Sequence, residues 1–167
     1  MANQWNNITL DKFAKIRAVI KEEGRTSDEK LIAFAAILQG VSEDELLGMP
    51  LDKAHPAFEL AAGLDAEPKR SAIRKTYIVG NWELKVTETK DISVAQWIDF
   101  QNFGRDIENH MTDILSVALI PKGKTYNEGY DIDALKRDLQ SQMTVPDALA
   151  VCFFFQKRWL RSMRRIL

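Results

Sequence analysis

Apolar residues recur every three or four positions along the first 63 residues, a spacing typical of amphipathic helices. Thr9 is placed to cap a helix that runs to about Glu23, just before Gly24. The start of the chain is therefore predicted to be a helical unit that packs around one apolar face. The stripe that the first helix would bury consists of Ile8, Phe13, Ile16, Val19 and Ile20.

Two capping boxes predict where the next helices begin. Thr26 with Glu29, and Ser42 with Glu45, have the spacing at which side chains satisfy the free amide groups of a first helical turn. Gly40 stands where the helix after Thr26 should end, because glycine readily adopts the left-handed conformation of a helix terminus.

The segment from Pro50 to about Ala62 is predicted as a further helix, with His55-Pro56 as a candidate break. Residues 64–74 are polar and have no apolar period, which is typical of a linker. The predicted organisation is a helical unit over residues 1–63, this linker, and a second unit over residues 75–167. The two units could also form one continuous domain.

The pattern changes to period two between residues 75 and 87, which indicates β-strands. Two runs rich in Tyr, Ile, Val and Trp flank Gly80-Asn81, a pair suited to a two-residue turn between antiparallel strands. We expect large side chains on both faces of this hairpin. Because an isolated hairpin is marginally stable in water, it should pack on helices or on another chain. Its large side chains are Tyr77, Val79, Trp82, Leu84 and Val86.

Helical periodicity returns in the second half of the chain. Ser93 and Gln96 form a third capping box, and the apolar pattern continues past a bend at Gly104 to Ala118. The chain is thus predicted to be α+β and mainly α. Two further helices are marked by Ile132, Leu135 and Leu139 and by the dense apolar run after Thr144.

Composition supports a globular protein. The chain has 167 residues, 46% of them hydrophobic, and a formal net charge of −1. A chain of this length buries roughly 70% of its extended surface, which is enough for a core. The lone Cys152 cannot form an internal disulfide, residues 1–5 lack the pattern of a secretion signal, and no apolar stretch is long enough to span a bilayer. We therefore expect a cytoplasmic protein that does not use a membrane.

Charge is distributed unevenly along the chain. Residues 1–67 carry 12 acidic and 7 basic side chains, residues 68–92 carry 3 and 6, and residues 148–167 carry five basic and no acidic side chains. The basic last helix has three interpretations: a core helix with a solvated basic face, a partner-binding helix, or a membrane-surface helix. Nucleic acid is disfavoured as a partner, because the helix-turn-helix pattern around Gly40 would turn the carboxylates of Glu43-Asp44-Glu45 toward phosphates.

No residue pattern indicates catalysis, a metal or a cofactor. Gly123-Lys124-Thr125 lacks the second glycine of a phosphate-binding loop, because Ala118 stands there, and turn residues follow it. A calcium loop starting at Asp131 would need a glutamate where Gln142 stands. Cys152 precedes three phenylalanines and is expected to be a buried, unreactive thiol. We therefore predict a non-enzymatic protein that needs no cofactor.

Several segments carry a resemblance to a known kind of protein. They are Trp5 with Ile8-Thr9-Leu10, then residues 41–51, 93–100, 126–132 and 147–156. With the predicted hairpin between them, these segments resemble small proteins of the tail assembly chaperone type from tailed bacteriophages of gut Bacteroidales. The resemblance implies a helix-rich protein of the host cell cytoplasm that binds the aggregation-prone tape measure protein and has no active site.

Two alternatives to a chaperone stay open. One is a structural virion component, such as a connector or tail-completion protein, that packs between subunits in the virion. The other is a host-directed regulator that uses the basic helix on phosphates. A chaperone or a structural virion component should bind another phage protein, or a further copy of itself, through the hairpin, the last helix or both. The residues predicted to contact that partner are Tyr77, Trp82, Trp159, Arg161, Met163, Arg164 and Arg165.

Overall fold

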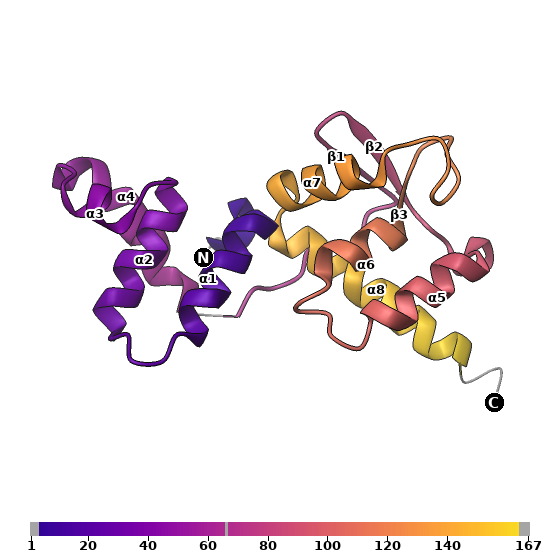
Figure 1. Cartoon of the computed structure of the whole chain (residues 1–167), viewed down its shortest axis with the longest axis horizontal. Coiled ribbons are helices and arrows are strands. Elements are labelled where there is room, and N and C mark those ends of the chain that lie inside the picture. The colour runs from indigo at the N-terminus through magenta and orange to yellow at the C-terminus, as the bar shows by residue number, and fades with distance from the viewer. Residues whose placement is uncertain (1–3, 66, 164–167) are drawn as a thin grey trace.

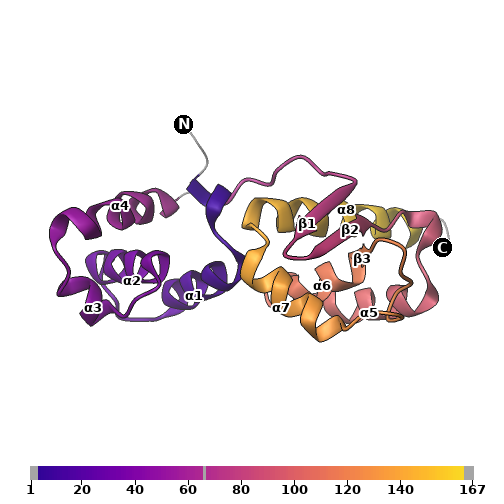
Figure 2. The ribbon, with the colours of Figure 1, turned by 90° about the horizontal axis from the view of Figure 1, so that it is seen from above.

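The computed structural model describes residues 4–65 and 67–163, without side chains for residues 65, 89 and 159–163. Two lobes lie side by side and give the molecule an elongated outline (Figures 1 and 2). The N-terminal lobe is helical, as predicted. It contains η1 (Gln4–Asn7), α1 (Leu10–Lys21), α2 (Ser27–Gln39), α3 (Glu43–Leu47), α4 (Leu51–Ala62) and η2 (Gly63–Asp65).

Local sequence signals set the helix starts in this lobe. Both capping boxes form as predicted: the hydroxyls of Thr26 and Ser42 accept the amides three residues ahead, and the carboxylates of Glu29 and Glu45 accept in return. Gly40 ends α2 with a φ of +77°, the left-handed conformation expected there. The candidate break at His55-Pro56 is absent, because α4 continues through Pro56 to Ala62.

The C-terminal lobe combines helices with a three-stranded antiparallel sheet. The predicted hairpin is confirmed, and its strands pair in the order β1-β2-β3. Gly80 has a φ of +55° at the first central position of the turn, which is the type II′ arrangement. The elements of this lobe are β1 (Thr76–Val79), β2 (Trp82–Val86), η3 (Thr89–Asp91), α5 (Val94–Phe103), α6 (Met111–Ala118), β3 (Leu119–Pro121), α7 (Ile132–Gln142) and α8 (Val145–Met163).

The predicted continuation of one helix past Gly104 is wrong. The helix α5 ends at Phe103, and α6 begins only at Met111. Between them the Asp106 carboxylate accepts hydrogen bonds from the backbone and side-chain amides of Asn109, at 3.3 and 2.6 Å. Such a local side-chain contact offers the backbone an alternative to the helical pattern.

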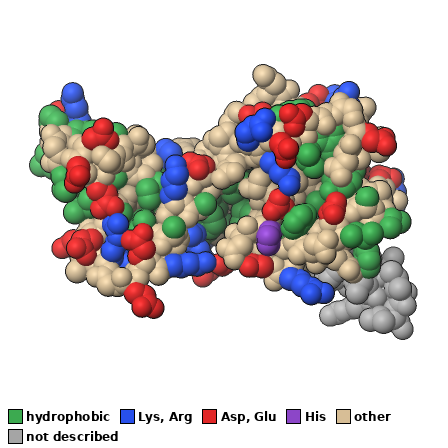
Figure 3. Space-filling view, viewed as in Figure 1, with side chains coloured by type: hydrophobic (Ala, Val, Ile, Leu, Met, Phe, Trp, Pro, Cys, Tyr) green, Lys and Arg blue, Asp and Glu red, His purple; other side chains and the backbone are tan. Residues whose placement is uncertain are grey.

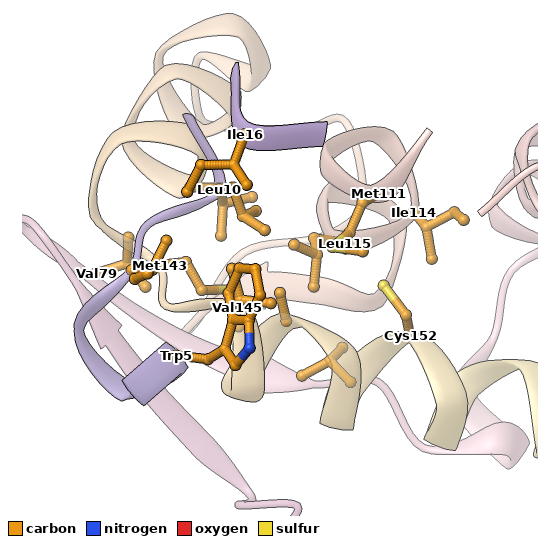
Figure 4. Close-up of a cluster of buried hydrophobic side chains, with 14 of the residues drawn as sticks. Trp5, Leu10, Ile16, Val79, Met111, Ile114, Leu115, Met143, Val145 and Cys152 are labelled. Atoms are coloured by element: carbon orange, nitrogen blue, oxygen red, sulfur yellow. The ribbon is translucent and has the colours of Figure 1, made fainter. Parts of the chain in front are cut away.

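One hydrophobic core runs through both lobes. Figure 4 shows Trp5 and Leu10 from the start of the chain in one cluster with Leu115 and Cys152 from the second half, all of them buried. Backbone hydrogen bonds reinforce this junction: the Leu10 amide donates to the Met143 carbonyl at 3.1 Å. Residues 67–75, most of the predicted linker, form no helix or strand and run past the first turn of α8, where the Ser71 amide donates to Pro146.

An ion pair joins α6 to α7 and makes stability depend on pH. The Asp113 carboxylate accepts a hydrogen bond from Lys136 at 2.8 Å and lies 3.2 Å from Nδ1 of His110. Burial acts to raise the pKa of Asp113, but the hydrogen bonds from Lys136 and His110 outweigh it, so the pKa is lowered below its usual 3.8. The folded state therefore favours the ionised form of this carboxyl.

Asp113→Asn is expected to lower the free energy of unfolding by about 1 kcal/mol at pH 7, because it removes this charge-assisted contact. A lowered pKa stabilises the fold above the unfolded pKa, and this stabilisation is lost as the pH falls through the folded value. The deficit should thus shrink as the pH falls below 3.8. Urea unfolding at several pH values tests this, with the exposed Asp133→Asn as control. A deficit that is equal at all pH values would contradict it.

Candidate protein-interaction surfaces

The five large side chains that were expected on both faces of the hairpin all lie on one face, so that expectation is wrong. Tyr77 lies opposite Leu84, and Val79 lies opposite Trp82, so these residues share one face with Val86. This face packs into the core, and Tyr77 is buried there. A residue in that position offers no surface to a partner of the folded chain.

Trp82 is half-buried and is engaged within the chain. Its Nε1 donates a hydrogen bond to the Asp138 carboxylate of α7 at 2.7 Å, and its ring meets Tyr130 edge-on. The opposite face of the hairpin carries the exposed Ile78 instead. Trp82 therefore connects the sheet to α7 within the chain.

The other predicted partner-binding residues lie near the C-terminal end of the chain. The backbone of Trp159, Arg161 and Met163 continues α8, whereas Arg164 and Arg165 lie outside the described residues. Their part in partner binding stays a prediction. In the preceding turns the helix turns Phe155 inward, where its ring packs edge-on against Phe100 with centroids 4.8 Å apart.

The structure brings the start of the hairpin and α8 together around one groove of about 530 Å³. We name it the basic groove, because four basic side chains line it and Glu88 is the one acidic residue among its lining. Its apolar part comes from Ile73 and Phe154, and the Arg158 guanidinium lies 4.3 Å from the centroid of the Phe154 ring. The basic groove is defined by Ile73, Arg74, Lys75, Lys85, Phe154 and Arg158.

Two of these cations are available to a partner. Arg74 already pairs with Asp147 and lies over the Tyr77 ring at 4.8 Å. Lys75 and Lys85, by contrast, form no ion pair with any residue that the structure describes. The sequence signal for this groove was the basic excess of residues 68–92 and of the last helix, but nothing local showed that the two segments meet.

A second surface is the outer face of α5. Val94 and Ile98 lie one helical turn apart with 76% and 49% of their surface exposed, and Trp97 beside them is half-buried. The opposite side of the helix points Gln96 and Phe100 into the core. We name Val94, Trp97 and Ile98 the α5 stripe. Figure 3 shows hydrophobic side chains gathered at the end of the C-terminal lobe where α5 lies.

A third surface is the turn between α3 and α4, far from the C-terminal lobe (Figure 1). Leu47 and Leu51 are 64% and 75% exposed there. Residues 43–53 contain four acidic side chains and one basic side chain, and we name this segment the acidic tip. On the face drawn in Figure 3, acidic side chains are spread over this lobe.

The motifs considered for nucleotide, calcium or thiol chemistry lie in a loop, at a helix start and in the core. Residues 123–125 lie in the loop after β3, and no helix begins directly behind them, as the turn residues predicted. Asp131 caps α7 through its carboxylate. Cys152 is fully buried, as expected. Within residues 4–65 and 67–163, no three metal-ligating side chains gather, and no helix is long and apolar enough to cross a membrane.

Comparison of the chain with protein-family models, with curated proteins and with solved structures gave no match. No relative therefore supplies a function or a set of site residues for this chain.

Proposed function

We propose that this chain is a non-enzymatic bacteriophage morphogenesis protein, a tail assembly chaperone that binds the tape measure protein in the host cell cytoplasm. The sequence resemblance supports this proposal. The structural observation that carries it is the α5 stripe, because residues 93–100 belong to the resembling segments and expose two large aliphatic side chains. Contiguous exposed apolar surface commonly marks a site of protein contact.

The α5 stripe has the form that a helical partner needs. Val94 and Ile98 are four residues apart and so lie on one side of the helix, with Trp97 at their edge. An amphipathic helix can lay its apolar face along such a stripe. A tape measure protein with a coiled-coil seam offers a face of this kind before the tail assembles. Covering that seam would keep it from aggregating.

The proposal predicts that a double substitution, Val94→Asp with Ile98→Asp, lowers capture of the tape measure protein by about ten-fold or more. Two carboxylates in an apolar contact would have to lose their water on binding, which is costly. The measurement is pull-down after co-expression, quantified against the total tape measure protein. Ile78→Asp is the matched control, because Ile78 is similarly exposed but lies on the hairpin.

Purified virions separate the chaperone from the structural alternative. A chaperone leaves before the particle matures, so mass spectrometry of particles should find the chain absent or far below the stoichiometry of tail proteins. A stoichiometric amount in mature particles would favour a connector or tail-completion protein. Unchanged capture by the α5 double variant would remove the structural support for tape measure binding at this helix.

A further inference from the structure

We propose that copies of this chain associate by docking the acidic tip of one copy into the basic groove of another. This inference concerns the isolated chain and does not depend on the tape measure protein. It rests on two surfaces of opposite charge, each with exposed apolar side chains, that lie on different lobes of one molecule.

The acidic tip combines free carboxylates with exposed leucines. Asp44 and Asp52 form no ion pair with another described residue. Their neighbour Glu43 is instead held by Arg25, whose guanidinium contacts both carboxylate oxygens at 2.9 and 3.1 Å. Glu45 is held in the capping box of α3. Two carboxylates thus shape the tip, and two remain for a partner, beside Leu47 and Leu51.

The basic groove has the complementary composition. Lys75 and Lys85 supply two ammonium groups that form no ion pair with a described residue, and Ile73 and Phe154 supply apolar lining. Four basic residues and one acidic residue line the groove, against four acidic and one basic in the tip. The formal charges are therefore equal and opposite, +3 and −3, which favours the tip of a second copy as the occupant.

The two surfaces cannot meet within one molecule, because they belong to separate lobes whose junction is fixed by a shared core (Figures 1 and 2). Contact between copies can close into an antiparallel pair or ring, or continue as an open chain. In each case the same tip meets the same groove. The α5 stripe is outside both surfaces, so self-association leaves it free.

Charge reversal on each side tests this contact. The tip variant carries Asp44→Lys and Asp52→Lys, and the groove variant carries Lys75→Glu and Lys85→Glu. Each alone should weaken self-association by roughly ten-fold or more, because two attractive pairs become repulsive. One chain that carries all four substitutions should regain association, since the charges are again opposite. The measurement is molar mass against protein concentration, by light scattering and sedimentation.

A double variant with Glu23→Lys and Arg105→Glu is the control. Both residues are exposed and lie outside the two surfaces, so it should keep the wild-type mass. Circular dichroism confirms that every variant is folded. Three results would overturn the proposal: a wild-type chain that stays monomeric, single-surface variants that associate like wild type, or a four-substitution chain that fails to recover. Duplex DNA binding by a monomeric wild type, lost in the groove variant, would assign the groove to nucleic acid instead.

Discussion

Trp5→Ala is expected to lower the free energy of unfolding by about 3–5 kcal/mol. Trp5 is 3% exposed and packs edge-on against Phe13 of α1, with ring centroids 5.6 Å apart. Figure 4 shows its ring next to Val145 at the start of α8. Removing an indole from this position leaves a cavity between the two lobes, and the surrounding backbone restricts its collapse.

The position of Trp5 explains why a single side chain should matter to both lobes. Three residues after it, the Ile8 carbonyl accepts the Val145 amide at 2.9 Å, and the Leu10 amide donates to the Met143 carbonyl. Thr9 and Thr144 pair as an isolated bridge between these bonds. The indole therefore packs against the segment that ties the first helix to the C-terminal lobe.

Cys152 supplies a second readout of the Trp5→Ala effect. Burial raises the pKa of its thiol to about 12, so the thiolate is scarce in the native state at neutral pH. Alkylation must then proceed through opening of the core. If wild type and Trp5→Ala are both alkylated through global unfolding, a loss of 3–5 kcal/mol should accelerate alkylation of Cys152 by roughly two to three orders of magnitude or more.

Leu51→Ala is the control for the Trp5 experiment, because Leu51 is largely exposed and its truncation should change stability by less than about 0.5 kcal/mol. Urea unfolding gives the free energies, and mass spectrometry follows alkylation. The prediction fails if Trp5→Ala unfolds within 1 kcal/mol of wild type or labels Cys152 at the wild-type rate.

Short-range signals account for the parts of the fold that could be predicted. A capping box is decided within four residues, so Thr26-Glu29 and Ser42-Glu45 located their helices without tertiary information. The hairpin turn at Gly80-Asn81 is equally local. The prediction that the large side chains lie on both faces of the hairpin was wrong. Period two across a two-residue turn already places Tyr77 and Leu84 on one side.

Long-range pairing accounts for the parts that could not be predicted. The strand β3 has three residues and ends in Pro121, so it carries no period of its own, and it exists because Ile120 pairs with Lys85. The basic groove likewise joins Lys75 to Phe154, which are far apart in the sequence. The sequence showed two basic segments, residues 68–92 and 148–167. That they lie side by side depends on how α8 packs within the C-terminal lobe.

Gln96 shows how a local signal can conceal a long-range role. Its Oε1 accepts the Ser93 amide at 3.1 Å, as the capping box predicted. Its Nε2 also donates to the Val117 carbonyl at 2.8 Å and to the Thr87 hydroxyl at 3.3 Å. Gln96 is one of two buried polar side chains among the described residues. Its hydrogen bonds join α5 to the end of α6 and to Thr87, the residue that follows β2.

Gln96→Glu is expected to lower the free energy of unfolding by about 3 kcal/mol at pH 7, because a buried carboxylate would face the Val117 carbonyl in place of a donor. Protonated, the new side chain can donate again, so its folded pKa should lie above the unfolded value of about 4.3. A carboxyl with a raised pKa destabilises the fold increasingly as the pH rises from the unfolded value to the folded one. The variant should therefore approach wild-type stability near pH 4 and lose it toward pH 7.

Gln96→Met is the matched control for this pH dependence. It has a similar length and cannot ionise, so it should lose about 1–2 kcal/mol at every pH through the unpaired Val117 carbonyl and Ser93 amide. Urea unfolding between pH 4 and pH 8 measures both variants. Parallel profiles for glutamate and methionine would show that the Gln96 amide does not face the Val117 carbonyl in solution. A gap that widens with pH would instead locate the donor where the structure has it, inside the junction of α5, α6 and the sheet.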